Sequence, residues 1–165
     1  MGVGMTKPEK KTNAMRMLET AGIAYETLYY EVGDEVFSGE TVSALIGVPP
    51  EQCFKTLCAR GDKRGILVFV IPVSSELDLK AAAVAAGDKA VEMVHTKELL
   101  ALTGYIRGGV SPVGMKKAYP TFIDETAQLF DVISISGGAK GCSLVVDPQK
   151  LAAYVSAEFA PLTRE

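Results

Sequence analysis

The chain has 165 residues, enough for one domain with a sizeable buried core. Hydrophobic residues make up 48% of it and charged residues 22%, a balance that excludes an intrinsically disordered chain. The formal net charge is −3, so any nucleic acid would have to be bound by a local basic patch rather than by the overall charge.

The start of the chain lacks the apolar middle of a signal peptide, and no apolar run reaches the roughly eighteen residues of a membrane span. We therefore expect a cytoplasmic protein with no membrane partner. Residues 1–10 are expected to form a disordered leader, and residues 11–165 a single domain.

The first elements are predicted to be a helix and a strand. Thr12 or Asn13 can cap a helix over 14–21, and Gly22 can end it. The following segment, 23–30, has the composition of an extended strand.

A second, shorter helix is expected to start at Ser38 or Thr41 and to run through Ile46. Gly47 stops it, because glycine readily adopts the left-handed conformation at which many helices end. The segment 53–60 is then predicted to be a strand.

The middle of the chain is predicted to contain a β-hairpin. Its turn is 61–65, and its second strand, 66–71, is so apolar that neighbouring elements must cover both of its faces. An alanine-rich helix over 78–86, a short strand over 89–94 and a helix around 99–100 are expected next.

The last part of the chain is predicted to supply three strands, over 121–123, 131–136 and 142–146. Asp147-Pro148 then starts a helix, with aspartate as the N-cap and proline at the first helical position, that is expected to reach about Phe159.

This order of elements predicts an α/β single domain in which a mixed, curled and barrel-like β-sheet is flanked by helices. Doubly wound nucleotide-binding folds are disfavoured. The chain has no glycine-rich turn between a first strand and a helix, and it has no G-x-x-x-x-G-K-[ST] sequence.

A glycine-rich segment, Gly104 to Lys117, is the most distinctive feature of the chain. Four glycines, one proline and three cations fall within these fourteen residues. Glycine allows close approach of the backbone to a ligand and proline fixes the chain, so the segment is interpreted as a rigid loop that presents backbone amides.

Lys55 is the second distinctive residue, because it lies inside a predicted strand and shares a face with Cys53 and Leu57. Two interpretations are open. The lysine could be solvated, with its stem lying along an edge strand. Alternatively, its ammonium could stand in a pocket, where it would bind phosphate or polarise a carbonyl.

Cysteine and histidine give little support for a metal site or a covalent catalyst. The three cysteines have no C-x-x-C spacing, and His95 has no second histidine to share a metal with. We expect reduced, packed thiols, no metal and no cofactor. A Cys-His dyad is disfavoured because His95 stands at a predicted helix entrance, and no G-x-S-x-G sequence is present.

Several motifs together resemble the YbaK family of aminoacyl-tRNA deacylases, and within it the Cys-tRNA(Pro) deacylase branch. The resemblance covers nearly the whole chain from about residue 11. It is carried by Lys11-Thr12-Asn13-Ala14, Phe54-Lys55-Thr56-Leu57, Gly104 to Gly114, Thr121 to Thr126 and Ser136-Gly137-Gly138.

The resemblance implies a free-standing relative of the editing insertion in bacterial prolyl-tRNA synthetases. Its substrate would be cysteine wrongly esterified to tRNA(Pro), or also Cys-tRNA(Cys), and its partners would be aminoacylated tRNA and prolyl-tRNA synthetase. Such editing is needed because a synthetase pocket gains only roughly 1–3 kcal/mol from small differences in apolar contact.

In this family the bound cysteine is thought to attack its own ester with its thiol. The resemblance then implies that Lys55 and Gly108 are the catalytic residues, with Lys55 holding the terminal adenosine or its phosphate. The other implied substrate-binding residues are Tyr30, Gly109, Val110, Ser111, Pro112, Ser136 and Gly137. The implied tRNA-binding residues are Arg107, Lys116, Lys117 and Lys140.

The sequence departs from the family at Ala139, where relatives often carry a second basic residue, and this puts one phosphate contact in doubt. The four cations could equally form a solvated face. Two other functions stay open: a deacylase for another small aminoacyl group, such as Ala-tRNA(Pro), and a non-catalytic module that binds aminoacyl or nucleotide ends.

Overall fold

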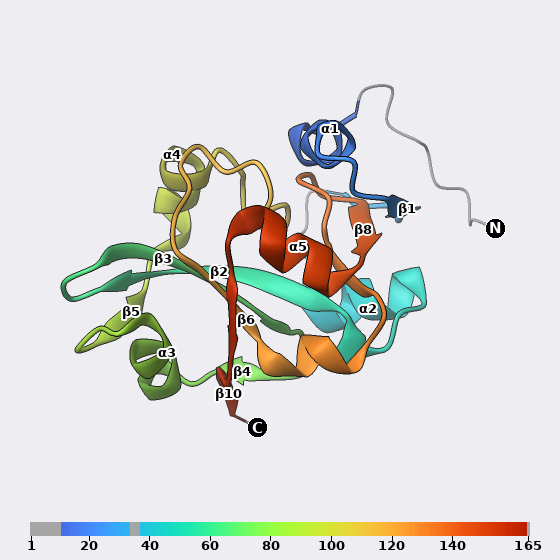
Figure 1. Ribbon diagram of the computed structural model, residues 1–165. Helices are drawn as coiled ribbons and strands as arrows, with labels where there is room; N and C mark the ends of the chain where they lie inside the picture. Colours follow the sequence, from blue (N-terminus) through green and yellow to red (C-terminus); the bar gives the residue numbers. More distant parts are fainter. Residues whose placement is uncertain (1–10, 34–36, 165) are drawn as a thin grey trace.

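The computed structural model describes residues 11–33 and 37–164, so the expected leader, 1–10, lies outside the described residues. Figure 1 shows the elements in sequence colours. The helices are α1 (Asn13–Thr20), α2 (Gly39–Ile46), α3 (Leu79–Ala86), α4 (Leu99–Thr103) and α5 (Pro148–Val155), with 3-10 turns η1 (Pro50–Gln52), η2 (Thr96–Glu98) and η3 (Glu125–Leu129). The strands are β1 (Tyr25–Tyr29), β2 (Phe54–Gly61), β3 (Gly65–Pro72), β4 (Glu76–Leu77), β5 (Val91–Met93), β6 (Thr121–Asp124), β7 (Ile133–Ser136), β8 (Cys142–Val146), β9 (Glu158–Ala160) and β10 (Thr163–Arg164).

The strands form three sheets. The largest has the order β5-β2-β3-β6-β9, the second has the order β1-β8-β7, and the third pairs β10 with β4. The pairs β3–β6 and β6–β9 are parallel, and the other ladders are antiparallel. The expected α/β fold with a mixed sheet is confirmed, although none of these sheets closes into a barrel within the described residues.

The predicted hairpin is present as β2 and β3, which run through the centre of Figure 1. Its turn brings Gly61 opposite Gly65. As expected for so apolar a strand, both faces of β3 are buried: Val68 and Val70 enter one core cluster, and Phe69 enters the other.

The two core clusters lie on opposite faces of the five-stranded sheet. On one face β2 and β3 pack against α1, α5 and the sheet of β1, β7 and β8. On the other face they pack against α3, where Phe69 stacks on Phe122 with ring centroids 5.5 Å apart. The site described below therefore lies on a strand that is anchored in both clusters.

Most helix ends follow the sequence signals, but the last helix is shorter than predicted. Asp147 Oδ1 accepts hydrogen bonds from Gln149 N and Lys150 N, as an N-cap should. The expected end near Phe159 is wrong. The helix stops at Val155, because Ser156 adopts a left-handed φ of 56° and the chain then joins the sheet as β9.

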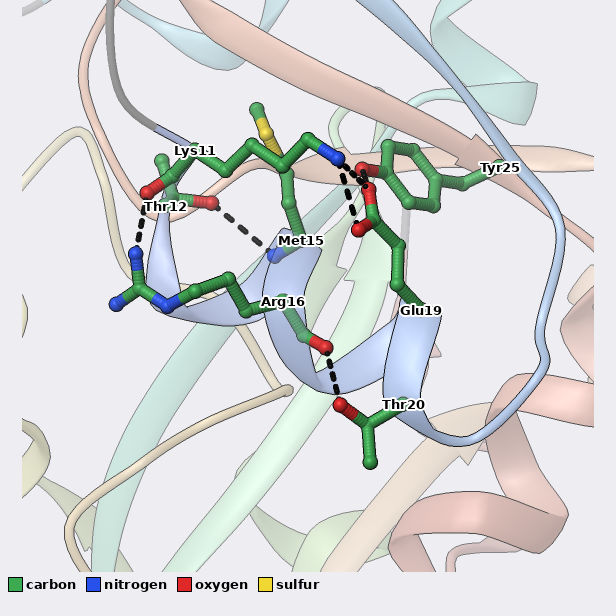
Figure 2. A network of polar contacts seen from close by, with 7 residues as sticks. All are labelled: Lys11, Thr12, Met15, Arg16, Glu19, Thr20 and Tyr25. Carbon is green, nitrogen blue, oxygen red and sulfur yellow. Dashed lines mark hydrogen bonds and ion pairs between the residues drawn. The ribbon is translucent and has the colours of Figure 1, made fainter.

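Figure 2 shows how α1 is tied to the start of β1. Thr12 Oγ1 caps the helix by accepting a hydrogen bond of 3.2 Å from Met15 N. At the other end Glu19 accepts hydrogen bonds from Lys11 Nζ and from the Tyr25 hydroxyl. No helix in the described part of the chain has the length and apolar character needed to cross a bilayer.

Candidate active site

A cavity of about 460 Å³ runs along β2. Its walls come from the start of α2, the segment 93–99, the glycine-rich loop and the strands β7 and β8. Separate stretches of sequence are thus brought together around one strand, β2.

The cavity lies where β2 has a free edge. Val73 N donates to Cys53 O at 2.8 Å, so the odd-numbered residues of β2 bond to β3 and the even-numbered residues turn their amides and carbonyls the other way. On that other side β5 pairs with residues 59–61 of β2, Val94 N donates to Cys58 O at 3.2 Å, and Ser134 forms an isolated bridge with Cys53. The backbone N–H and C=O of Thr56 are therefore on the unpaired edge, beside the cavity.

The Lys55 side chain lines the cavity and is half-buried. Its ammonium makes no hydrogen bond or ion pair within the described residues. Arg107 lies exposed at the rim, and no aspartate or glutamate is among the described residues that line the cavity. The cavity is therefore positively charged, which suits the phosphates of a nucleic-acid end.

The glycine-rich loop presents Gly108 and Val110 to the cavity. Gly108 has a φ of 91°, a conformation that favours glycine. In the described part of the chain neither of these two amides donates a hydrogen bond, whereas Gly109 N donates to Ile106 O at 2.9 Å. Two residues whose amides are free thus line the cavity, and the amide of Gly109 between them is already used.

Hydrogen bonds inside the loop hold these amides in place. The Tyr105 hydroxyl donates to Val113 O, and Ser111 Oγ accepts from Val113 N at 3.2 Å. Asn13 Nδ2, at the start of α1, donates to Gly114 O at 3.3 Å. Ser111 is fully buried and bonded within the loop, so its contribution is to the shape of the loop.

The structure brings together part of the predicted set of site residues. The residues that line the cavity are Tyr30, Lys55, Arg107, Gly108, Val110 and Ser136. Those that lie outside its lining are Gly109, Ser111, Pro112, Gly137, Lys116, Lys117 and Lys140. Of the latter, Lys116 and Lys117 are exposed and Lys140 is half-buried.

Hydroxyl groups that the sequence did not single out also line the cavity. Ser134 and Ser143 lie on the same face of the β7–β8 ladder as Ser136, and Thr56 lies on β2. A serine in a short apolar strand carries no recognisable signal in the sequence.

The protein thiols and the histidine are poor candidates for a nucleophilic dyad. Burial raises the pKa of the Cys58 thiol to about 11 and also raises the pKa of Cys53, so both thiols that line the cavity stay protonated at neutral pH. His95 is not among the residues that line the cavity. The site offers free amides, an ammonium and hydroxyls rather than an activated nucleophile.

The chain was compared with known families, proteins and solved structures. The family model of the aminoacyl-tRNA editing domain matches residues 34–154. EbsC of Enterococcus faecalis, an inferred Cys-tRNA(Pro)/Cys-tRNA(Cys) deacylase, is 43% identical over 157 residues, which cover 95% of this chain and 96% of EbsC. The proline–tRNA ligase of Bacillus licheniformis is 27% identical over 104 residues, 63% of this chain and 17% of the much longer ligase.

Solved structures agree with this relationship. The crystal structure of an inferred trans-editing enzyme for prolyl-tRNA synthetase has a TM-score of 0.79 at 25% identity, and the match covers 95% of this chain and all of that one. The crystal structure of the hypothetical protein APE2540 has a TM-score of 0.83 at 23% identity, and the match covers 93% of this chain and all of that one. The second match concerns the fold alone.

Proposed function

From the premise that the chain belongs to the family of aminoacyl-tRNA editing domains, we propose that it is a trans-editing deacylase that removes cysteine from Cys-tRNA(Pro). The observation that carries this proposal is one cavity that combines an unpaired ammonium, from Lys55, with the free amides of Gly108 and Val110. An ester at the end of a polyanion needs both kinds of group.

The two amides are suited to hold the ester carbonyl. Negative charge develops on its oxygen when the carbonyl carbon is attacked, and fixed backbone donors stabilise that charge without reorganising. The loop already has its internal hydrogen bonds, so the donors are in place before substrate binds.

The nucleophile in this proposal is the thiol of the bound cysteine. Its sulfur bonds to its own carbonyl carbon, the bond to the 3′ oxygen of the ribose breaks, and the thiol proton goes to that oxygen. Water then opens the resulting thiolactone to free cysteine. This route needs no protein nucleophile, which fits a cavity whose own thiols are held protonated by burial.

Lys55 is assigned to binding the terminal adenosine or its phosphate. Its ammonium is free and stands beside the cavity, where a lysine acts on phosphate as a compact point charge. Arg107 at the rim, with Lys116, Lys117 and Lys140 outside the cavity, would meet phosphates further along the tRNA.

The partner and the location follow from the substrate. Charged tRNA is the partner that the family implies, and prolyl-tRNA synthetase is proposed as the source of the mischarged tRNA and as a docking partner. Charged tRNA is used in translation, which is consistent with the cytoplasmic location expected from the sequence. That location stays a prediction.

A panel of charged tRNAs tests the proposal. Purified protein is mixed with Cys-tRNA(Pro), Ala-tRNA(Pro) and Cys-tRNA(Cys), and the loss of aminoacyl ester is followed against buffer. Cys-tRNA(Pro) should be cleared, Lys55→Ala should lose most of the activity, and Lys63→Ala, which removes an exposed lysine from the β2–β3 turn, should keep it.

The panel also separates the other functions. Cleavage of Ala-tRNA(Pro) alone would replace cysteine by alanine as the substrate. Binding of tRNA ends without any cleavage would make the protein a binding module and would overturn the proposed enzyme.

A further inference from the structure

The cavity has a buried floor and an exposed rim. Met93, Arg107 and Gly108 are exposed at the rim. The lining residues that are each at most 8% exposed form its floor: Tyr30, Cys53, Phe54, Cys58, Val73, Val110, Ser134, Ile135 and Ser143. An aminoacyl-tRNA that enters at the rim beside Arg107 leads with its aminoacyl group, because that group is the last unit of the chain. The amino-acid side chain therefore reaches furthest towards the floor.

Ser134 is placed on that floor by the alternation of β7. Its neighbours Ile133 and Ile135 are buried in the core between the two sheets. Side chains alternate along a strand, so Ser134 points to the opposite face, the one it shares with Ser136. Ser143 stands directly across from Ser136 in the β7–β8 register, and all three serines line the cavity.

The Ser134 hydroxyl has no hydrogen-bond partner in the described part of the chain, although the residue is only 1% exposed. Cys53 is its neighbour across a parallel bridge, and the hydroxyl opposes part of the rise that burial causes in the pKa of that thiol. The two side chains nevertheless fall short of hydrogen-bond geometry, and sulfur is a weak acceptor. A buried hydroxyl left unpaired destabilises a fold, and an alanine at this position would avoid that cost.

The other unpaired buried hydroxyl is that of Thr56. It is too far from Ser134 for one small aminoacyl side chain to reach both. Cys53 is level with Ser134, and Thr56 lies three residues further along β2, roughly 10 Å away at about 3.3 Å per residue. Of the two fully buried hydroxyls that lack a partner in the described part of the chain, Ser134 is thus the one at this end of the cavity.

We infer that Ser134 is the specificity-determining residue for the aminoacyl side chain, whose thiol or hydroxyl it hydrogen-bonds on the floor of the cavity. The inference rests on the proposed function and adds the class of substrate: small aminoacyl groups with a polar atom on Cβ. A site that buries an unpaired hydroxyl discriminates against ligands that leave it unpaired. Cysteinyl and seryl ends should therefore bind better than alanyl or 2-aminobutyryl ends.

The test measures binding rather than cleavage, so that it does not depend on the thiol chemistry. The ligands are adenosines that carry cysteine, serine, alanine or 2-aminobutyrate on a 3′ amide, which the enzyme cannot hydrolyse by the ester route. The 2-aminobutyryl group has a methyl in place of the cysteine thiol, so it differs from cysteinyl only in the polar atom. Dissociation constants are measured by calorimetry for each ligand.

Wild-type protein should bind the cysteinyl and seryl amides roughly tenfold more tightly than the 2-aminobutyryl amide, as expected for one hydrogen bond. Ser134→Ala should remove this preference by weakening the cysteinyl and seryl amides alone. The variant should also melt about 2–4 °C higher, because it no longer buries an unpaired hydroxyl.

Two further variants control for packing. Ser134→Thr keeps the hydroxyl and should keep the preference, with weaker binding of all four ligands because of its extra methyl. Thr121→Val alters a buried hydroxyl on β6, outside the cavity lining, and should leave the ratios unchanged.

Equal affinities of wild-type protein for the cysteinyl and 2-aminobutyryl amides would overturn the inference. So would a Ser134→Ala variant that weakens all four ligands alike, or none of them. Each of these results would leave deacylation of Cys-tRNA(Pro) intact. Failure of the proposed function would be seen separately, as intact ester in the tRNA panel.

Discussion

Gly109→Ala is expected to damage the site without removing any group that touches substrate. A Cβ on Gly109 would lie 3.0 Å from Ala139 Cα and 3.2 Å from Ala139 N and C. These are backbone atoms of the β7–β8 turn, which is held by the bond from Gly137 N to Cys142 O. Carbon contacts are favourable only from about 3.5 Å, so the loop must retreat by roughly half an ångström.

This retreat would carry Gly108 and Val110, on either side, away from the ester carbonyl. A misplacement of 1 Å can cost about 100-fold in rate, so half of that should lower kcat/KM for Cys-tRNA(Pro) by roughly tenfold. Overpacking should also cost about 1–3 kcal/mol of stability.

The assay is deacylation at 25 °C, with circular dichroism to verify that the variant is folded. Gly33→Ala is the matched control, because its Cβ would meet no atom of the described residues within 4 Å and its φ is not in the left-handed region. Activity of Gly109→Ala within twofold of wild type would refute the idea that the turn positions the loop.

Three further predictions concern charge and pH. Burial raises the pKa of Cys58 and Cys142 to about 11, so both thiols stay protonated in the folded protein at a pH at which they ionise in the unfolded chain. Urea titrations should therefore show the free energy of unfolding falling from pH 9 to 11, by up to roughly 2–3 kcal/mol per thiol. A constant free energy of unfolding over this range would contradict the burial of the thiols. Arg107→Gln should weaken tRNA binding and reduce the slope of log affinity against log salt by about 0.7–0.9, measured by filter binding; an unchanged slope would remove Arg107 from the phosphate contacts. Lys11→Met should leave the urea midpoint unchanged, because the ion pair of Lys11 with Glu19 is exposed. A clearly lower midpoint would show that this ion pair stabilises the fold.

Local sequence signals predicted the elements whose ends are set by one residue. Asp147 caps α5 and Gly87 ends α3, as their side chains and conformations require. The end of α5 was not predictable in this way. The segment Glu158–Ala160 is apolar enough to continue a helix, and it becomes a strand because β6 offers a parallel partner distant in sequence. Strands as short as β4 and β10 exist only through their pairing with each other.

The candidate site was predictable in part for similar reasons. Period-2 reasoning placed Lys55 on the face of Cys53 and Leu57, and the glycine-rich loop was recognisable from its composition. The close approach of the Gly109 backbone to that of Ala139 depends on contacts across the fold, and so does the lack of a hydrogen-bond partner for the Ser134 hydroxyl. A single serine between two isoleucines gives no sign of what lies opposite it.

Editing by this cavity can be measured as the initial rate of cysteine release from Cys-tRNA(Pro), with wild-type protein, Lys55→Met and buffer alone. We expect wild-type protein to release cysteine well above the buffer rate and Lys55→Met, which keeps most of the length of the side chain without its charge, to fall close to the buffer rate. Release at the buffer rate by wild-type protein, or equal rates for the two proteins, would contradict the assignment of this cavity as an editing site.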